Sequence, residues 1–440
     1  MERRNFFRLT ALATLGATLI PGCTSGPAGG ATGPATSSFP RPTGKDFTGT
    51  KVLLGIDVLA ADNFAVVQGL RCGLVTHKAG VNGAGARTVD ILANAPGVKL
   101  KKLFGPEHGI DGNAPAEVVI KNARDARTGL PIYSLYGATR RPTPAMLADL
   151  DVIIIDFQDI GSRSYTYISC MRYVIEACFS LDRPIKVIVL DRPNPLGGEK
   201  VDGPFIDRDR RSYVGAYEMP YVHGLTIGEI ARWAVATPGV LEISEAQRQR
   251  GKLEVIGMRN WKRSMTWDQT GLTWIPTSPR IPSPQATLGY AMVGLGCIIG
   301  DFSHSFGNQY HFRFLKYGRK RSADLVSTMG TAVPGLQLKP MVMTDGTQGV
   351  YTTVSDWGKL KPSALSLYMM RQCCAWSATN PFATATANER DLFIKHVGSA
   401  DLFNELKTKG AAIDLSAWLA KWDAQSASFR ARTAPFRLYA

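Results

Sequence analysis

The chain has 440 residues, of which 45% are apolar and 20% are charged, so its composition is that of a globular protein and excludes a disordered one. Its formal net charge is +15, which favours an anionic partner such as an acidic polymer or an anionic lipid surface. The positive residues are dispersed and match no nucleic-acid-binding motif, so we expect no nucleic-acid partner.

The first 22 residues have the order of parts found in an export signal. Arg3-Arg4 precede an apolar run over 9–20 that is too short to span a bilayer, and Ile20-Pro21-Gly22-Cys23 resembles a lipobox. We predict a twin-arginine signal peptide of the lipoprotein type over 1–22, with Cys23 lipidated as the first mature residue. The expected location is the periplasm, at a membrane. An ordinary Sec signal with a chance cysteine is the alternative.

The rest of the chain divides by composition. Residues 23–46 are rich in Gly, Pro, Ser, Ala and Thr, which predicts a flexible linker. We predict a first α/β domain over 47–260, because strand and helix patterns alternate there. Beyond residue 260 the pattern weakens into a segment rich in Trp, Pro and Gly, and it returns near the C-terminus. We therefore predict a second, smaller C-terminal α/β lobe over 261–440.

The predicted elements of the first domain include four short apolar runs that indicate buried strands, over 72–76, 100–104, 151–156 and 185–190. The last two are almost continuous in β-branched residues, which is typical of parallel strands covered on both faces. Strands that alternate with helices predict an α/β fold with a doubly wound parallel sheet.

Three helices follow from local patterns. Apolar residues at helical spacing predict a helix over 168–178, with Ser162 or Ser164 capping its start. Thr226 and Glu229 form a capping-box pattern ahead of another helix. A last helix is predicted over 415–429.

Polar residues follow each of the four predicted strands directly. The carboxyl ends of parallel strands line one crevice, where ligands bind, so we expect these side chains to converge. The candidates in chain order are His77, Glu107, His108, Asp156, Gln158, Asp159, Arg163, Asp191, Arg192 and Asn194. A structural role is the alternative for each one, since Asp159 can hold a backbone amide and Asp191 can form a turn.

Several chemistries lack their motifs. No G-x-G-x-x-G follows the first strand, no P-loop is present, and no G-x-S-x-G elbow is found, which disfavours a dehydrogenase, an NTPase and an esterase. The candidate histidines are far apart and no C-x-x-C pair stands beside them, so we expect neither a metal nor a cofactor. Free thiols are the default for the six cysteines beyond Cys23, and disulfides are the alternative.

Five motifs in order resemble the signatures of one family, the exo-β-N-acetylmuramidases. They are Gly73–His77, Phe104–Gly109, Asp156–Tyr167, Leu190–Gly198 and His223–Glu229. Near the C-terminus, Phe429-Arg430 and the segment Pro435–Tyr439 resemble the closing motif of the family.

The resemblance implies a Rossmann-like lobe and a smaller C-terminal lobe with the active site in the cleft. The implied activity is removal of a terminal N-acetylmuramic acid from peptidoglycan-derived saccharides. By motif match Glu107 is the first candidate for the catalytic acid, Glu117 is the second glutamate, and Asp156 is a further candidate. Two carboxylates, or one carboxylate and the substrate's 2-acetamido group, perform such chemistry.

Substrate binding is expected from the other motif residues, including Tyr165 and His223. Arg163 or Arg192 is expected to meet the lactyl carboxylate with two parallel hydrogen bonds. Tyr165 has two open roles, stacking on the sugar or packing in the core.

One segment, 296–308, departs from the acidic and G-R-G-T-like pattern that the family implies. This departure keeps a second function open, a non-catalytic envelope lipoprotein that binds muropeptides or glycan ends.

Overall fold

The structure, a computed structural model, describes residues 51–304 and 310–440. The predicted signal peptide over 1–22, the linker over 23–46 and the lipidation site Cys23 therefore lie outside the described residues. Within the described ranges, no helix combines the length and apolar character that crossing a bilayer requires.

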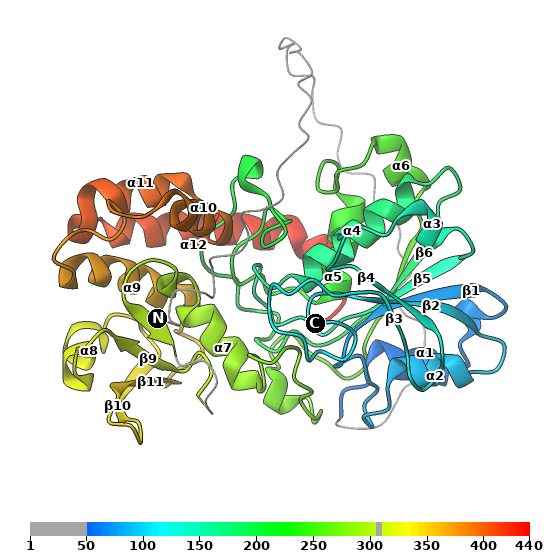
Figure 1. Cartoon of the computed structure of the whole chain (residues 1–440), viewed down its shortest axis with the longest axis horizontal. Coiled ribbons are helices and arrows are strands. Elements are labelled where there is room, and N and C mark those ends of the chain that lie inside the picture. The colour runs from blue at the N-terminus through cyan, green and yellow to red at the C-terminus, as the bar shows by residue number, and fades with distance from the viewer. Residues whose placement is uncertain (1–50, 305–309) are drawn as a thin grey trace, which may run out of the picture.

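Within these ranges, the first lobe is built on a seven-stranded sheet of order β3-β4-β2-β1-β5-β6-β7 (Figure 1). Its strands are β1 Arg71–Thr76, β2 Lys99–Gly105, β3 Ala123–Arg124, β4 Pro131–Ser134, β5 Val152–Asp156, β6 Lys186–Leu190 and β7 Leu253–Ile256. Neighbouring strands are parallel except for the edge pair β3 and β4. The four predicted strands coincide with β1, β2, β5 and β6, and the predicted parallel sheet is confirmed.

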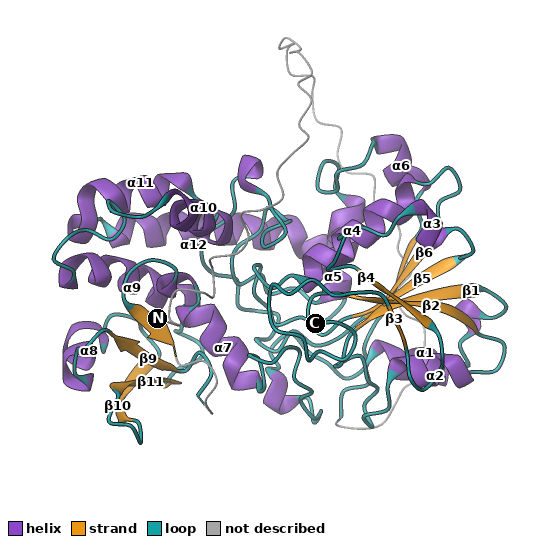
Figure 2. Cartoon of the chain, in the orientation of Figure 1, coloured by secondary structure: helices purple, strands orange, loops and turns teal. Residues whose placement is uncertain are grey.

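Helices cover both faces of this sheet (Figure 2). They are α1 Gly55–Ala61, α2 Thr88–Asn94, α3 Pro144–Leu147, α4 Tyr167–Ser180, α5 Ile227–Ala236 and α6 Glu245–Arg250. Side chains along a strand alternate between the faces. On β5, Ile154 lies in one core with Leu59 of α1, whereas Ile153 lies in the other core with Ile168 of α4. Burial on both faces explains why this strand is apolar throughout.

The order of the strands places a switch point between β1 and β5. The chain runs from β1 to β2 on one side and later returns to β5 on the other side. Loops at the carboxyl ends of two such strands diverge and leave a crevice for a ligand. The loops that the sequence singled out lie at this edge.

The starts of α4 and α5 differ in how they are capped. Helix α5 begins at the predicted capping box, in which the Thr226 hydroxyl accepts from the Glu229 amide and the Glu229 carboxylate accepts from the Thr226 amide. The N-cap of α4 is Thr166, which makes no side-chain cap bond. The prediction that Ser162 or Ser164 caps α4 was wrong, because the helix begins after these residues.

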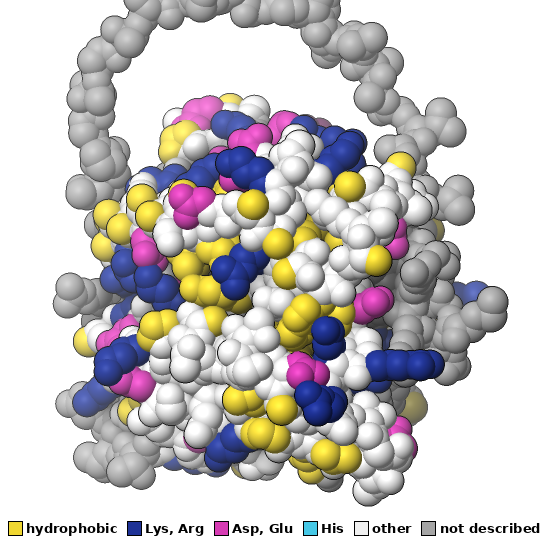
Figure 3. All heavy atoms as spheres, turned by 90° about the vertical axis from the view of Figure 1, so that its left-hand side faces the viewer, with side chains coloured by type: hydrophobic (Ala, Val, Ile, Leu, Met, Phe, Trp, Pro, Cys, Tyr) yellow, Lys and Arg dark blue, Asp and Glu magenta, His cyan; other side chains and the backbone are white. Residues whose placement is uncertain are grey.

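The second lobe contains an antiparallel sheet of order β10-β11-β9-β8. Its strands are β8 Phe302–His304, β9 Phe314–Tyr317, β10 Leu336–Val342 and β11 Gln348–Val354. Its helices are α7 Pro284–Val293, α8 Ser322–Met329, α9 Pro362–Trp376, α10 Ala387–Val397, α11 Ala400–Lys409 and α12 Leu415–Thr433. The predicted helix over 415–429 is α12. Lys and Arg side chains are scattered over the outer face of this lobe among acidic and apolar ones (Figure 3).

Two segments connect the lobes. Residues 257–283 follow β7 and stay against the first lobe, where Arg263 pairs with Glu229 and the Trp267 amide donates to Pro195. The predicted C-terminal lobe over 261–440 therefore includes a stretch that packs on the first sheet. After α12 the chain returns to the first lobe, and the Arg263 amide donates to the Ala440 carbonyl at 2.8 Å.

Candidate active site

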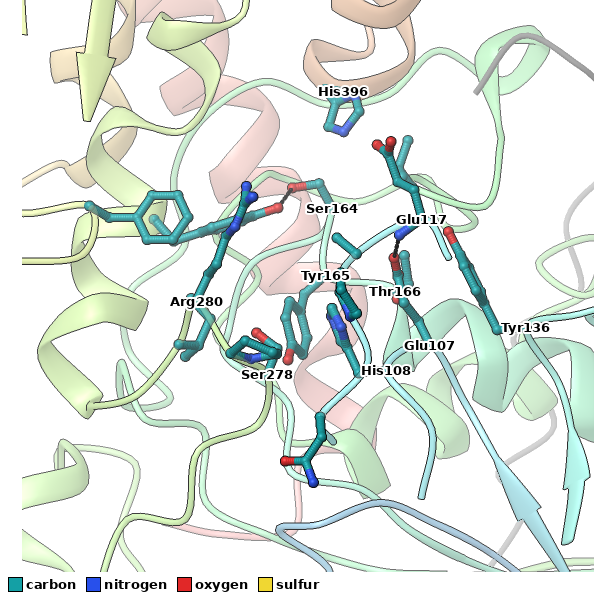
Figure 4. Close-up of a pocket in the computed structure, with 18 of the residues that line it drawn as sticks. Glu107, His108, Glu117, Tyr136, Ser164, Tyr165, Thr166, Ser278, Arg280 and His396 are labelled. Atoms are coloured by element: carbon teal, nitrogen blue, oxygen red, sulfur yellow. Dashed lines mark hydrogen bonds between the residues drawn. The ribbon is translucent and has the colours of Figure 1, made fainter. Parts of the chain in front are cut away.

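A cleft of about 260 Å³ opens at the carboxyl edge of the large sheet, between the two lobes (Figure 4). Loops of the first lobe line one side of it, and α7, α10 and the segment that precedes α7 line the other side. The polar lining residues are Glu107, His108, Asn113, Glu117, Tyr136, Ser164, Tyr165, Thr166, Ser278, Arg280, Tyr290 and His396. Polar groups that converge on a concave surface mark this cleft as the candidate site.

Glu107 follows the end of β2 and is 8% exposed. Its carboxylate is fixed at both oxygens, since Oε2 accepts from the Thr166 hydroxyl at 2.7 Å and Oε1 accepts from the Glu117 amide at 3.2 Å. His108 turns the chain directly afterwards with φ of +70°, and its Nδ1 lies 2.9 Å from the Ala114 carbonyl oxygen. The loop thus presents Glu107 to the cleft in one orientation.

Glu117 lies on the same loop and also lines the cleft. Burial raises the pKa of its carboxyl, the negative charge of Glu107 raises it further, and Arg280 acts in the opposite direction. Its backbone has φ of +67°, a conformation that costs a non-glycine residue on the order of 1–2 kcal/mol. The fold therefore holds two carboxylates in one cleft at some conformational cost, which is common at functional sites.

The tyrosines of the β5–α4 connection have structural bonds. The Tyr165 hydroxyl donates to Thr277 Oγ1 at 2.9 Å, and the Tyr167 hydroxyl donates to the Thr277 carbonyl at 2.7 Å. The two rings meet edge to face, with centroids 4.7 Å apart. Tyr165 lines the cleft, whereas Tyr167 is fully buried. Both tyrosines tie the segment that precedes α7 to the floor of the cleft.

Comparison with known proteins identifies the family. Residues 72–285 match the family model of the exo-β-N-acetylmuramidase NamZ N-terminal domain, and residues 288–439 match the model of its C-terminal domain. The chain belongs to the exo-β-N-acetylmuramidase family. The peptidoglycan β-N-acetylmuramidase NamZ of Bacillus subtilis (strain 168) is 36% identical over 351 residues, which cover 77% of this chain and 82% of that protein.

Solved structures agree with this membership. A DUF1343 family protein from Bacteroides fragilis NCTC 9343 superposes with a TM-score of 0.79 at 34% identity, covering 89% of this chain and all of the other (100%). A second DUF1343 family protein from the same organism superposes with a TM-score of 0.64 at 23% identity, covering 88% and 99% of the two chains, and this likeness concerns the fold.

In this exo-β-N-acetylmuramidase family member, four of the candidate residues line the cleft: Glu107, His108, Glu117 and Tyr165. The others lie behind or beside it. Asp156 is fully buried, and its carboxylate accepts from Arg192 and from the Thr88 hydroxyl at 2.5 Å. Arg192 also donates to the Val81 carbonyl, so the pair joins β5, β6 and the loop after β1.

Histidines and amides from the other motifs also hold loops together. His77 Nε2 accepts from the Gln158 amide at 3.0 Å, and burial keeps the pKa of this histidine well below its usual value. His223 Nε2 lies 3.1 Å from Asp159 Oδ2, while its Nδ1 accepts from the Leu225 amide. Asn194 donates to the Leu225 carbonyl. These contacts join the loops after β1, β5 and β6 to one another and to the stretch that precedes α5.

Asp191 serves the start of α5. Its carboxylate accepts from the Gly228 amide, from the Thr226 hydroxyl and from the Tyr439 hydroxyl. Burial raises its pKa to about 6. The alternative structural role that the sequence left open for Asp191 is the one its contacts support.

Arg163 and Arg192, either of which was expected to meet a substrate carboxylate, do not line this cleft, and Arg192 lines a second pocket of about 370 Å³ instead. Arg163 is fully buried, and its Nη2 donates to the carbonyls of His396 at 3.0 Å and Val397 at 3.2 Å. A cation in this place satisfies the last carbonyls of α10. Arg163 therefore fastens the second lobe to the first.

Several lining residues were missed by sequence reasoning, including Tyr136, Ser278, Arg280 and His396. Arg280 lies in a segment with prolines at 279, 282 and 284. Prolines at this spacing indicate an exposed loop, which could have identified the segment from the sequence. His396 lies on α10, 233 residues after Arg163 of the β5 loop. No motif around His396 indicates a binding role. Burial lowers the pKa of His396 to about 4.

The departing segment 296–308 lies in the second lobe as far as it is described. The Gly296 amide donates to the Ser366 hydroxyl at 3.0 Å, and the described residues 296–304 do not line the cleft. Residues 305–309 lie outside the described part. Among the described residues, no group of three or more His, Cys, Asp or Glu is placed to hold a metal, and the six cysteines are free thiols.

Proposed function

We propose that this chain is an exo-acting glycosidase that releases a terminal N-acetylmuramic acid from peptidoglycan fragments, with Glu107 as its proton donor. The observation that carries the proposal is a buried glutamate at the carboxyl edge of the sheet, fixed at both oxygens and open to the cleft. The substrate class comes from the relative of Bacillus subtilis, whose name describes a peptidoglycan β-N-acetylmuramidase.

The chemistry needs a proton for the leaving oxygen and a stabilised oxocarbenium-like centre. In the proposal Glu107 protonates the glycosidic oxygen. Glu117, on the same loop, faces the developing positive charge or orients the 2-acetamido group of the sugar as an internal nucleophile. Water then captures the sugar, and the proton it gives up returns to Glu107. Each step uses a group that lines the cleft.

Hydrolysis of the disaccharide MurNAc-GlcNAc tests the proposal. We expect the protein without residues 1–46 to release free N-acetylmuramic acid, and Glu107→Gln to lose roughly 10²- to 10⁴-fold in kcat, as removal of a general acid does. Glu199→Gln, which alters an exposed glutamate outside the cleft, is the matched control and should retain full turnover.

The same experiment decides between an enzyme and a binding protein. If the unaltered protein and Glu107→Gln both bind the disaccharide, as measured by calorimetry, and neither releases sugar, the cleft belongs to a non-catalytic muropeptide-binding lipoprotein. Equal thermal midpoints for the two proteins would show that a loss of turnover is not a loss of folding.

The proposed location is the cell envelope, with the chain exported and anchored to a membrane through lipid on Cys23. The support is the sequence of Arg3-Arg4, the apolar run and the cysteine in the order of a lipoprotein signal. We expect metabolic labelling with a radioactive fatty acid to mark the full chain and not Cys23→Ser. Equal labelling of the two chains would exclude Cys23 as the lipidated residue.

A further inference from the structure

Arg280 gives the cleft its permanent positive charge. Among the described residues that line the cleft, it is the sole Lys or Arg. Figure 4 shows its side chain entering from one side, across from Glu107 and Glu117 on the other. Burial lowers the pKa of Arg280 and the charge of Glu117 raises it, so the guanidinium and this carboxylate act on each other across the cleft.

The backbone around Arg280 is fixed to the same segment that fixes Glu107. Thr277, three residues before Arg280, accepts hydrogen bonds from the hydroxyls of Tyr165 and Tyr167. Between these tyrosines, Thr166 donates to the Glu107 carboxylate. Tyr165, Thr166 and Tyr167 thus link the backbone near Arg280 to the Glu107 carboxylate.

A further hydrogen bond closes the loop that carries Arg280. The indole Nε1 of Trp274 donates to the carbonyl of Ile281 at 3.2 Å, which ties the residues before and after Arg280 together. Ser278 is 4% exposed and Thr277 is fully buried, so the loop is anchored in the protein body up to the residues next to Arg280. A side chain on such a support is preorganised to bind a ligand group at one place.

The charges of the cleft restrict where an anionic substrate group can lie. The Glu117 carboxylate on one side repels an anionic group, and a guanidinium on the other side can bind a carboxylate with two parallel hydrogen bonds. A sugar with its glycosidic bond at Glu107 therefore has its acidic substituent directed toward Arg280.

We propose that Arg280 binds the lactyl carboxylate of the terminal sugar and thereby makes the cleft select N-acetylmuramic acid over N-acetylglucosamine. This inference rests on the proposed function and adds the residue that sets its specificity. A lost hydrogen-bonded charge pair corresponds to roughly ten- to hundredfold in kcat/KM.

Three p-nitrophenyl β-glycosides test the inference with the full-length chain: those of N-acetylmuramic acid, of its lactyl methyl ester and of N-acetylglucosamine. We expect the unaltered protein to cleave the acid at least about tenfold better than the ester, which lacks the charge. Arg280→Gln should lose this preference by losing kcat/KM on the acid alone. Arg280→Lys should keep part of it, because an ammonium retains the charge without the planar fork.

Arg319→Gln removes an equal charge from an exposed position outside the cleft and should leave all three rates unchanged. Equal cleavage of the acid and the ester by the unaltered protein would overturn the inference. This comparison uses no variant, so it remains valid even if Arg280→Gln does not fold. An acid-over-ester preference that persists in active Arg280→Gln would also overturn it. Cleavage of none of the three glycosides would overturn the proposed function, and this inference with it.

Discussion

Glu107 is oriented by a residue 59 positions further along the chain, Thr166. Thr166 is the N-cap of α4, yet its hydroxyl makes no cap bond and donates to the glutamate instead. A hydroxyl at this position would ordinarily stabilise the start of the helix. Here the hydroxyl points into the cleft, where it orients the carboxylate that we propose as the proton donor.

Thr166→Val removes this donor and keeps the shape of the side chain. We expect kcat on MurNAc-GlcNAc to fall about tenfold with little change in KM, because a hydrogen bond to a carboxylate contributes roughly 1.5–3 kcal/mol. Thr166→Ser keeps the hydroxyl and should retain most of the turnover. Steady-state kinetics at one pH measure all three proteins, and an unchanged kcat for Thr166→Val would show that Glu107 does not depend on Thr166.

The four polar loops at the ends of the strands have two different tasks. The loops after β2 and β5 supply residues that line the cleft, such as Glu107 and Tyr165. The loop after β6 faces the start of α5 instead. A Cβ on Gly228 would lie 2.7 Å from the Asp191 carboxyl carbon, so α5 packs directly against the Asp191 side chain. Close packing of a helix therefore keeps Asp191 out of the cleft, although its loop is as polar as the others.

The molecule as a whole is closed by its C-terminal tail. The Tyr439 hydroxyl accepts from the Met258 amide at 2.9 Å and donates to Asp191, and the Leu438 amide donates to Glu229 at 2.9 Å. These bonds return the end of the second lobe to the core of the first. Together with Arg163 at the end of α10, they join the two lobes that form the walls of the cleft.

Tyr439→Phe removes one hydroxyl from this closure, and its cost should depend on pH. Burial raises the pKa of Asp191 to about 6, and the hydrogen bond from Tyr439 opposes that rise. In the unfolded chain the carboxyl titrates near about 4, so the folded chain holds the proton longer. The stability from Asp191 is thus complete below about pH 4 and is lost as pH rises through about 6.

Without the Tyr439 hydroxyl, the ionised Asp191 loses one of its hydrogen-bond donors and keeps those from Gly228 and Thr226. We expect Tyr439→Phe to lower the free energy of unfolding by about 1–3 kcal/mol at pH 8 and by less at pH 4, where the carboxyl is protonated in the folded chain. Urea unfolding at the two pH values measures this difference. A larger loss at pH 4 than at pH 8 would contradict the expected direction.

The sequence by itself determined the fold class, the positions of β1, β2, β5 and β6, and the edge of the sheet where the candidate site lies. These features depend on local patterns: β-branched runs, and polar residues at the point where each strand ends. The five motifs also indicated the family, which the comparisons confirm.

Only the tertiary structure decided which polar residues face the cleft. Asp156, Arg192 and Arg163 are charged residues at strand ends, as binding residues often are. In the structure they are buried, and each pairs with a group that is distant in the sequence. Arg280 reached the cleft because Tyr165 and Tyr167 hold the loop that precedes it. The sequence does not distinguish a charged residue that is buried with a partner from one that faces a ligand, because neighbours from distant parts of the chain make the difference.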